Sequence, residues 1–296
     1  MSFLTALRTW GEMIKFSHSV FALPFAFVAA ALAGATLPAG RPAAPQIALI
    51  LWCMVAARSF AMTCNRIADA AIDARNPRTA ARPIPAGRIT PRQSLAFLLA
   101  CAAAFIAGCA AFLADRNPWP LALSLPVLAC LAAYSYTKRF TALSHFALGA
   151  AIAAAPLAAW IAVNPRTVGA PALLLAAAVA AWIAGFDIIY ACQDIAVDRR
   201  DGLHSLPARL GAARALMVSR ACHAGTVSML YALGRLSQMG PLYWAGVAAV
   251  ALLLIVEQSL VRADDLSRVN VAFFTVNGMV GLVFAAAAIA DVLARS

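Results

Sequence analysis

Long apolar runs, repeated along the whole chain, constrain its fold more than any other feature of the sequence. A helix needs about 20 apolar residues to cross the roughly 30 Å of hydrocarbon in a bilayer. Nine runs of about that length occur, roughly over residues 18–37, 44–64, 94–114, 119–137, 142–163, 170–191, 212–232, 240–261 and 270–293. The sequence therefore predicts an all-α, polytopic membrane protein with about nine transmembrane helices.

The composition and the connections between the runs agree with this fold class. Hydrophobic residues make up 64% of the 296-residue chain and charged residues only 12%, which is far from the composition of a soluble domain. The connections are too short to hold a soluble domain, so a single membrane-embedded domain over residues 1–296 is expected. The first run is expected to be a true span and not a cleavable signal, because no obvious small-residue cleavage site ends it.

The net charge of +11 is explained by topology rather than by a nucleic-acid partner. Most of the 23 Lys and Arg residues lie in the N-terminal segment, or in and beside the connections that follow the even-numbered runs. The opposite connections hold only Arg41, Arg116, Arg166, Arg235 and Arg295. Basic connections stay in the cytoplasm. We therefore expect an integral protein of the lipid bilayer, in a bacterial inner membrane, with its N-terminus and even-numbered connections inside and no nucleic acid bound.

Acidic residues gather in two short segments, at the ends of the second and sixth runs. The first covers residues 65–73 (NRIADAAID) and the second residues 194–201 (DIAVDRRD). Together they hold five of the 12 Asp and Glu residues. We call them the first acidic segment and the second acidic segment; their side chains of interest are Asn65, Asp69 and Asp73, and Asp194, Asp198 and Asp201.

The spacing of these residues predicts a cation site. Side chains four residues apart lie on one face of a helix, where like charges repel unless a cation bridges them. All the candidate ligands carry oxygen, which suits Mg²⁺, or Mn²⁺, better than zinc. Solvated surface carboxylates are the alternative interpretation. Two such segments beside apolar runs, in a chain this poor in acid, favour a bound cation or substrate at a cytoplasmic-side site.

A basic, proline-rich loop is expected over about residues 66–92, directly after the second apolar run. Four prolines rule out one continuous helix through it, and its arginines include Arg78, Arg82, Arg88 and Arg92. Such a loop suits the cover of a phosphate-bearing ligand, with Arg66, Arg78 and Arg82 as diphosphate ligands. The alternative is a positively charged anchor that only fixes topology.

The remaining candidates lie at the ends of other runs. Lys138 and Arg139 end the fourth run and Lys15 opens the first, so each suits a clamp on a diphosphate or simply the topology. Tyr190, one turn before Asp194, would orient a substrate or act as an interfacial aromatic. Asp187 would reach a cavity or pair with a neighbouring helix. His145 and His223 are assigned to packing or to the membrane interface, and His204 is expected to help shape the second acidic segment.

Four stretches of the sequence resemble the UbiA-type intramembrane prenyltransferases. NRIADAAIDARNPRTAARPIPAGRIT (65–90) is similar to that family's N-x-x-x-D-x-x-x-D followed by R-T-x-x-R-P-x-P-x-G. YACQDIAVDRRDGLHSLPARLG (190–211) resembles its second aspartate segment. Residues 134–160 resemble its fourth-to-fifth helix connection, and KFSHSVFALPFA (15–26) its first helix.

The resemblance implies nine helices around a central cavity. It implies Mg²⁺ held through Asp69, Asp73, Asp194 and Asp198, with Asn65 assisting, and transfer of a prenyl group from an isoprenoid diphosphate to an aromatic acceptor. Ionisation of the allylic C–O bond would give a cation that attacks an electron-rich ring carbon. An apolar cavity would keep water from that cation.

The acceptor and the class of function stay open at this point. The stretches 15–26 and GLHSLPARLG (202–211) look most like enzymes that join a polyprenyl diphosphate to 4-hydroxybenzoate in ubiquinone biosynthesis. Relatives that use a 1,4-dihydroxy-6-naphthoate-type acid in the futalosine route to menaquinone are the alternative. A membrane transporter is the alternative outside the enzymes, because intramembrane acids also mark ion paths.

Overall fold

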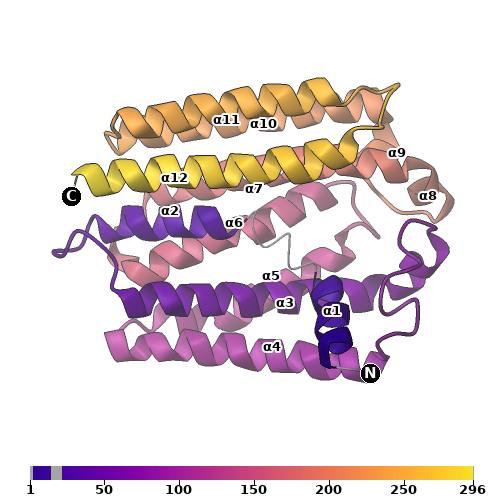
Figure 1. The fold of residues 1–296 in the computed structure, drawn as a ribbon, viewed down its shortest axis with the longest axis horizontal. Helices are drawn as coiled ribbons and strands as arrows, with labels where there is room; N and C mark the ends of the chain where they lie inside the picture. Colours follow the sequence, from indigo (N-terminus) through magenta and orange to yellow (C-terminus); the bar gives the residue numbers. More distant parts are fainter. Residues whose placement is uncertain (1–2, 15–21, 296) are drawn as a thin grey trace. The chain divides into compact units, whose positions relative to one another are not determined.

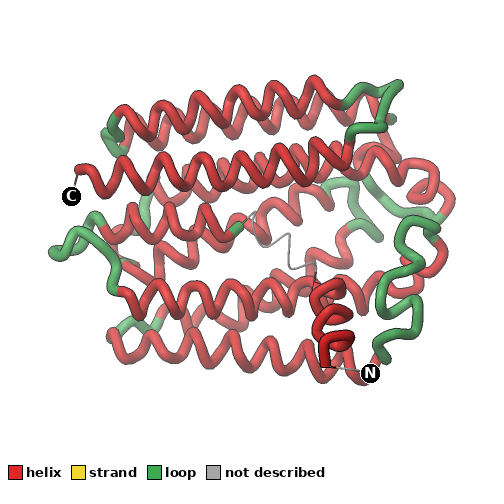
Figure 2. Tube along the Cα trace, viewed as in Figure 1, coloured by secondary structure: helices red, strands yellow, loops and turns green. Residues whose placement is uncertain are grey.

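The apolar runs form helices in the computed structural model of the protein, which describes residues 3–14 and 22–295 (Figures 1 and 2). No β-strand occurs among these residues, as the sequence predicts. The α-helices are α1 (Phe3–Ile14), α2 (Leu23–Gly34), α3 (Ala44–Arg75), α4 (Pro91–Ala111), α5 (Trp119–Thr137), α6 (Ser144–Val163), α7 (Ala170–Ala191), α8 (Ile195–Arg200), α9 (Leu206–Leu210), α10 (Ala212–Leu236), α11 (Pro241–Leu260) and α12 (Asn277–Arg295).

Short 3₁₀ or π-helical turns adjoin several of these α-helices. Three 3₁₀ turns, η2 (Phe112–Asp115), η3 (Pro165–Thr167) and η4 (Cys192–Asp194), follow α4, α6 and α7. A π-helical turn, η5 (Val271–Val276), leads directly into α12.

Seven of the described helical stretches are long and apolar enough to cross a membrane. They contain α3, α4, α5, α6, α7, α11 and α12. The described part of the first run, α2, has 12 residues and is apolar but short, and the seventh run forms α10, a helix of 25 residues. The protein is therefore an integral membrane protein, whereas the number of nine spans stays a prediction.

The described residues divide into two compact units. One unit is drawn from residues 1–19 and 49–136, and the other from residues 20–48 and 137–296. The first acidic segment belongs to the first of these units and the second acidic segment to the other. We describe each unit by itself.

Helix α7 is the centre of the larger unit, where it packs against both α6 and α10. Helix α2 packs against α6 and α12, and α11 packs against α12. Small residues permit the closest approaches. A Cβ on Gly149 of α6 would lie 2.3 Å from the carbonyl oxygen of Ala180, and one on Gly185 of α7 would lie 2.4 Å from the His223 ring.

In the smaller unit, a glycine likewise lets α3 and α4 pack closely. The Trp52 indole on α3 donates a hydrogen bond to the carbonyl of Ala104 on α4, at 2.8 Å. Gly108 leaves room for that ring, because a Cβ there would lie 2.6 Å from it. Thr90 begins α4 with a capping box to Gln93, and Pro91 occupies its first turn.

Two predicted boundaries differ in the structure. The loop after the second run is shorter than predicted, because α3 continues as helix through the first acidic segment to Arg75. The sixth run does not carry the second acidic segment on one unbroken helix. It ends at Ala191, a 3₁₀ turn follows, and α8 begins at Ile195.

Candidate functional site

The first acidic segment forms the predicted stripe on the last two turns of α3. The Asn65 amide donates a hydrogen bond to the Asp69 carboxylate four residues later, at 3.1 Å. Asp69 is only 2% exposed and Asp73 4% exposed. Carboxylates this buried are stable only with polar or charged partners. The helical spacing that the sequence predicts for these three residues is confirmed.

The loop after α3 folds back to bring an arginine onto the segment. Arg82 contacts both carboxylate oxygens of Asp73 through one guanidinium nitrogen, at 2.7 Å each. Thr79 supports this turn by donating its hydroxyl to the backbone carbonyl of Asp73 at 3.0 Å. Asn76 accepts a hydrogen bond from the backbone N–H of Arg78 at 3.0 Å. The fold of this loop therefore places the Arg82 guanidinium beside the Asp73 carboxylate.

A second arginine lies within α3 itself. Arg66 is 4% exposed and interacts electrostatically with Asp69, Asp73 and Arg82. Its Nε has no hydrogen-bond partner among the described residues. Arg88 has a different role, because it donates to Glu12 of α1 at 2.7 Å and to the carbonyl of Ala81 at 2.9 Å. Arg66 and Arg82 are thus the arginines that lie at the carboxylates, while Arg88 ties the loop to α1.

The second acidic segment is built on the break between α7 and α8. Asp194 closes the 3₁₀ turn, and Asp198 lies in the first turns of α8. The Asp198 carboxylate accepts a hydrogen bond from the Ser205 side chain and interacts with Asp194, Lys138 and His145. Two carboxylates and a lysine therefore lie close together in this unit.

A backbone hydrogen bond of Lys138 joins it to the connection that carries the second acidic segment. Its carbonyl accepts a hydrogen bond from the backbone N–H of His204 at 2.7 Å, which fastens the α5–α6 connection to the α8–α9 connection. The prediction that His204 helps shape the second segment agrees with this bond. Arg139 is exposed on the same connection.

Histidine 145 is a residue of this site that the sequence reasoning assigned to packing. Its Nδ1 lies 2.6 Å from the Asp187 carboxylate on α7, and its Nε2 accepts the backbone N–H of Leu206 at 3.3 Å. Because Nε2 is an acceptor, Nδ1 carries the proton and donates to Asp187. Of the two roles predicted for Asp187, pairing with a neighbouring helix is the one found. A polar Ser-His pair at the start of an apolar run was the available signal.

The remaining predicted residues fall in three places. Tyr190 packs against Phe273, with ring centroids 4.2 Å apart, and against Phe274 at 6.3 Å. Asp201 accepts a hydrogen bond from the neighbouring Arg200 at 3.0 Å. Lys15 lies outside the described residues, so its predicted role stays a prediction.

The donor set of the two segments fits a hard divalent cation that is completed by a ligand. All the candidate donors are carboxylate or amide oxygens, which Mg²⁺ prefers. Among the described residues, no group of three or more His, Cys, Asp and Glu side chains is placed to hold a metal ion by itself. Mg²⁺ is usually bound through one or two carboxylates plus substrate phosphates. Each segment thus offers carboxylates for a metal and cations for the phosphates.

Comparison with known families and proteins gives one consistent match. The family model described as the UbiA prenyltransferase family matches residues 22–279. A protein named 4-hydroxybenzoate octaprenyltransferase from Nitrosomonas europaea is 33% identical, over 87% of this chain and 86% of its own. The protein of the same name from Methylococcus capsulatus is 30% identical, over 83% of this chain and 82% of its own.

Solved structures match over nearly the whole chain. The apo structure of a UbiA homologue from Aeropyrum pernix K1 superposes with a TM-score of 0.82 at 33% identity, covering 93% of this chain and 98% of that one. A UbiA homologue from Archaeoglobus fulgidus, solved with GPP and Mg²⁺ bound, has a TM-score of 0.73 at 19% identity, covering 96% and 99%. The second likeness concerns the fold alone.

Proposed function

Because this chain belongs to the UbiA prenyltransferase family, we propose that it transfers a polyprenyl group from an isoprenoid diphosphate to 4-hydroxybenzoate. The relatives that cover most of its length carry the name 4-hydroxybenzoate octaprenyltransferase, which supports this acceptor and a place in ubiquinone biosynthesis. The length of the prenyl chain used by this protein is left open.

The observation that carries the proposal is the pairing of carboxylates with cations in each acidic segment. Asp73 lies against Arg82, and Asp198 lies beside Lys138. A metal–diphosphate needs both kinds of group, because the metal requires anionic oxygens and the phosphates require cations. The alternative interpretation, in which the carboxylates only form a solvated helix face, does not explain why basic side chains lie beside them.

We assign the metal to the residues that supply oxygen. Each acidic segment would supply oxygen ligands to a divalent cation, Mg²⁺ by the chemistry of the donors and Mn²⁺ as the substitute. The ligands are Asp69 and Asp73, with Asn65, in the first segment, and Asp194 and Asp198 in the second. The Archaeoglobus fulgidus homologue bound to Mg²⁺, and in another structure to Cd²⁺, supports a divalent metal. When bound, the metal neutralises charge on the departing diphosphate.

The basic residues act on the same leaving group. Arg66, Arg78 and Arg82 from the first unit, and Lys138 and Arg139 from the second, donate hydrogen bonds to phosphate oxygens; Lys15 is the further candidate. Preorganised donors of this kind stabilise the charge that develops as the allylic C–O bond breaks. The electron pair of that bond leaves with the diphosphate.

The remaining steps of the reaction need an aromatic acceptor and a site from which water is excluded. A ring carbon of 4-hydroxybenzoate attacks the allylic carbon, a C–C bond forms, and the ring loses its proton. The apolar helices keep water from the allylic carbon. The family's activity on a lipid substrate agrees with an integral membrane protein, and we propose a bacterial inner membrane with the reaction near its cytoplasmic face.

An acceptor screen tests the proposal. The purified protein is incubated with geranyl diphosphate, Mg²⁺ and either 4-hydroxybenzoate or 1,4-dihydroxy-6-naphthoate, and the prenylated product and free diphosphate are measured. We expect Mg²⁺-dependent product with 4-hydroxybenzoate. Product with the naphthoate alone would move the protein to the menaquinone route.

Variants separate the enzyme from a transporter. Asp69→Asn and Asp194→Asn should each lower product formation by at least about 100-fold, the effect of losing one key electrostatic group. Asp264→Asn removes an exposed aspartate that pairs only weakly with Arg262, at 3.3 Å, and serves as the control. Absence of turnover with every acceptor, together with unchanged behaviour of the Asp69 and Asp194 variants, would contradict the proposed enzyme.

A further inference from the structure

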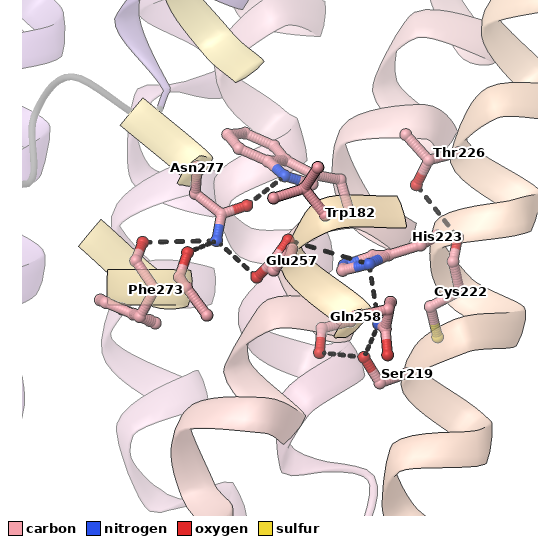
Figure 3. A network of polar contacts seen from close by, with 12 residues as sticks. Trp182, Ser219, Cys222, His223, Thr226, Glu257, Gln258, Phe273 and Asn277 are labelled. Carbon is pink, nitrogen blue, oxygen red and sulfur yellow. Dashed lines mark hydrogen bonds and ion pairs between the residues drawn. The ribbon is translucent and has the colours of Figure 1, made fainter. Parts of the chain in front are cut away.

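A network of buried polar side chains lies in the larger unit, away from both acidic segments in sequence. It joins α7, α10, α11 and the beginning of α12 (Figure 3). At its centre are Glu257 and Asn277, both 0% exposed. A buried carboxylate and a buried amide are costly unless they are hydrogen-bonded. Their presence in helices that are otherwise apolar requires an explanation.

The Asn277 side chain uses both ends of its amide. Its oxygen accepts the Trp182 indole N–H at 2.6 Å. Its nitrogen donates to the Glu257 carboxylate at 2.7 Å, and lies 3.0 Å from the carbonyl of Ala272 and 3.3 Å from that of Phe273. This set of partners fixes the orientation of the amide, because the opposite one would face a nitrogen toward the indole N–H.

The two backbone carbonyls belong to the π-helical turn η5. A π turn closes with i→i+5 bonds and so holds one residue more than an α turn. The Asn277 side chain hydrogen-bonds both of these carbonyls. Single π turns inside α-helices are rare and are frequent at functional sites.

A second arm of the network reaches Glu257 through His223 of α10, whose Nδ1 lies 3.9 Å from the second Glu257 carboxylate oxygen. Gln258, the residue after Glu257, donates to Ser219 at 2.8 Å and lies 2.9 Å from Nδ1 of His223. Ser219 in turn donates to the carbonyl of Gly185 on α7 at 2.8 Å. Figure 3 shows this arm meeting the Asn277 arm at Glu257. The network therefore anchors the start of α12 to the central helix α7.

The π turn sets where an aromatic ring points. Phe273 lies in η5 and packs against Tyr190 with ring centroids 4.2 Å apart, and against Phe186 at 5.1 Å. If η5 relaxed into an α-helix, Phe273 and the residues before it would rotate relative to α12 by about 100°, the angle per residue of an α-helix. Phe273 would then leave the Tyr190 ring.

We propose that Asn277 is a positioning residue for prenyl transfer, which holds the π turn so that Phe273 and Tyr190 form one aromatic surface beside the second acidic segment. The proposal rests on the proposed function and takes, of the two roles predicted for Tyr190, the one in which its ring orients the substrate. An isoprenoid whose diphosphate is held near Asp194 would place its first carbons along this surface. The faces of aromatic rings attract a carbon that develops positive charge.

A double-mutant cycle tests whether Asn277 acts through Phe273. Asn277→Leu, Phe273→Leu and the double variant are compared for kcat/KM with geranyl diphosphate. We expect each single variant to lose between about 10- and 100-fold, the scale of a small misplacement at a reacting group. The double variant should be within about 2-fold of Phe273→Leu alone, because both changes remove the same surface.

The matched control is Asn270→Leu, the same substitution at an exposed residue directly before η5. It should retain the wild-type kcat/KM. If the losses of Asn277→Leu and Phe273→Leu multiply in the double variant, Asn277 does not act through the aromatic surface and the inference is wrong. An inactive wild-type protein would instead contradict the proposed function.

A measurement that needs no catalytic turnover tests whether Asn277 holds the π turn η5. Backbone hydrogen exchange over residues 271–277, measured by mass spectrometry on the full-length wild-type and Asn277→Leu proteins, should rise at least about 10-fold in the variant. Exchange elsewhere in α12 should stay the same, which shows that the variant is folded. Unchanged exchange over η5 would overturn the proposal even if activity fell.

Discussion

At the scale of single residues, Asp73 and Arg82 show how the first acidic segment can hold opposite charges before a substrate binds. Both carboxylate oxygens of Asp73 lie 2.7 Å from one nitrogen of Arg82. In the proposed reaction Arg82 would donate hydrogen bonds to the phosphate oxygens of the substrate. The Asp73 carboxylate would then be available as a ligand for the divalent cation.

Substitution Arg82→Gln should lower both stability and activity. The Asp73 side chain, 6% exposed, would lose its cation, whereas the Arg82 side chain is 21% exposed, so partial screening limits the loss of unfolding free energy to about 1–3 kcal/mol. The kcat/KM for the diphosphate should fall about 100-fold. Thermal unfolding in detergent and product formation measure the two effects.

The control is Arg92→Gln, which replaces an exposed arginine at the start of α4. Equal stability and activity of the Arg82 and Arg92 variants would contradict the role of Arg82.

At the scale of helices, the His145–Asp187 pair links three elements of the larger unit. Asp187 lies on α7, His145 on α6, and the N–H that His145 accepts belongs to the first residue of α9. The pair therefore fixes the connection that carries the second acidic segment. A histidine that donates to a carboxylate and accepts a backbone N–H has a single usable tautomer.

His145→Leu and Asp187→Asn should each be destabilising, by about 1–3 kcal/mol, because each leaves a buried polar partner unsatisfied. The double variant should be clearly less destabilised than the sum of the two, since each removes the same hydrogen bond. Chemical or thermal unfolding in detergent gives these values. Strict additivity would show that the pair contributes nothing.

Glycines test the helix packing directly. Gly149→Ala would push a Cβ to 2.3 Å from a backbone carbonyl of α7, which cannot move aside, so it should destabilise by about 1–3 kcal/mol. Gly225→Ala in α10 meets nothing within 4 Å and should be neutral or stabilise by about 0.5–1 kcal/mol, the helix propensity gain of alanine. If both variants unfold at the same temperature, the described α6–α7 contact is wrong.

The sequence was sufficient for the parts of the site that follow helical periodicity. The contact between Asn65 and Asp69 follows from their spacing alone. The break after Ala191 was not predicted, and neither was the π turn η5, which is held by the contacts of Asn277 with Trp182 and Glu257 of other helices. His145 was missed for the same reason, since its partners lie 42 and 61 residues away in the chain.

At the scale of the whole molecule, the surface of the helices agrees with a lipid environment. Large apolar side chains are exposed on helices of both units, among them Leu99 at 61%, Leu125 at 65%, Leu252 at 63% and Ile255 at 67%. Soluble proteins rarely expose so many large apolar residues together. The basic connections adjoin both acidic segments, as expected for cytoplasmic loops.

Cysteine labelling tests this topology. In a chain whose native cysteines are replaced by serine or alanine, Ala81→Cys and Gly202→Cys should be labelled only when the cytoplasmic side is exposed to a membrane-impermeant maleimide. Ala43→Cys and Asp115→Cys should be labelled from the opposite side; all four positions are exposed. Labelling of Ala81→Cys and Gly202→Cys from opposite sides would contradict the predicted cytoplasmic location of the two connections.

Equilibrium binding of a non-cleavable geranyl thiodiphosphate measures directly whether the protein needs both acidic segments to bind a metal–diphosphate. Binding to the purified protein is measured with and without Mg²⁺, for the wild type, Asp69→Asn, Asp194→Asn, the double variant and the Asp264→Asn control. We expect Mg²⁺-dependent binding that each single variant weakens at least about 10-fold, or about 1.4 kcal/mol, and that Asp264→Asn leaves unchanged. Mg²⁺-independent binding, or binding that needs only one of the two segments, would contradict the proposed roles of Asp69 and Asp194.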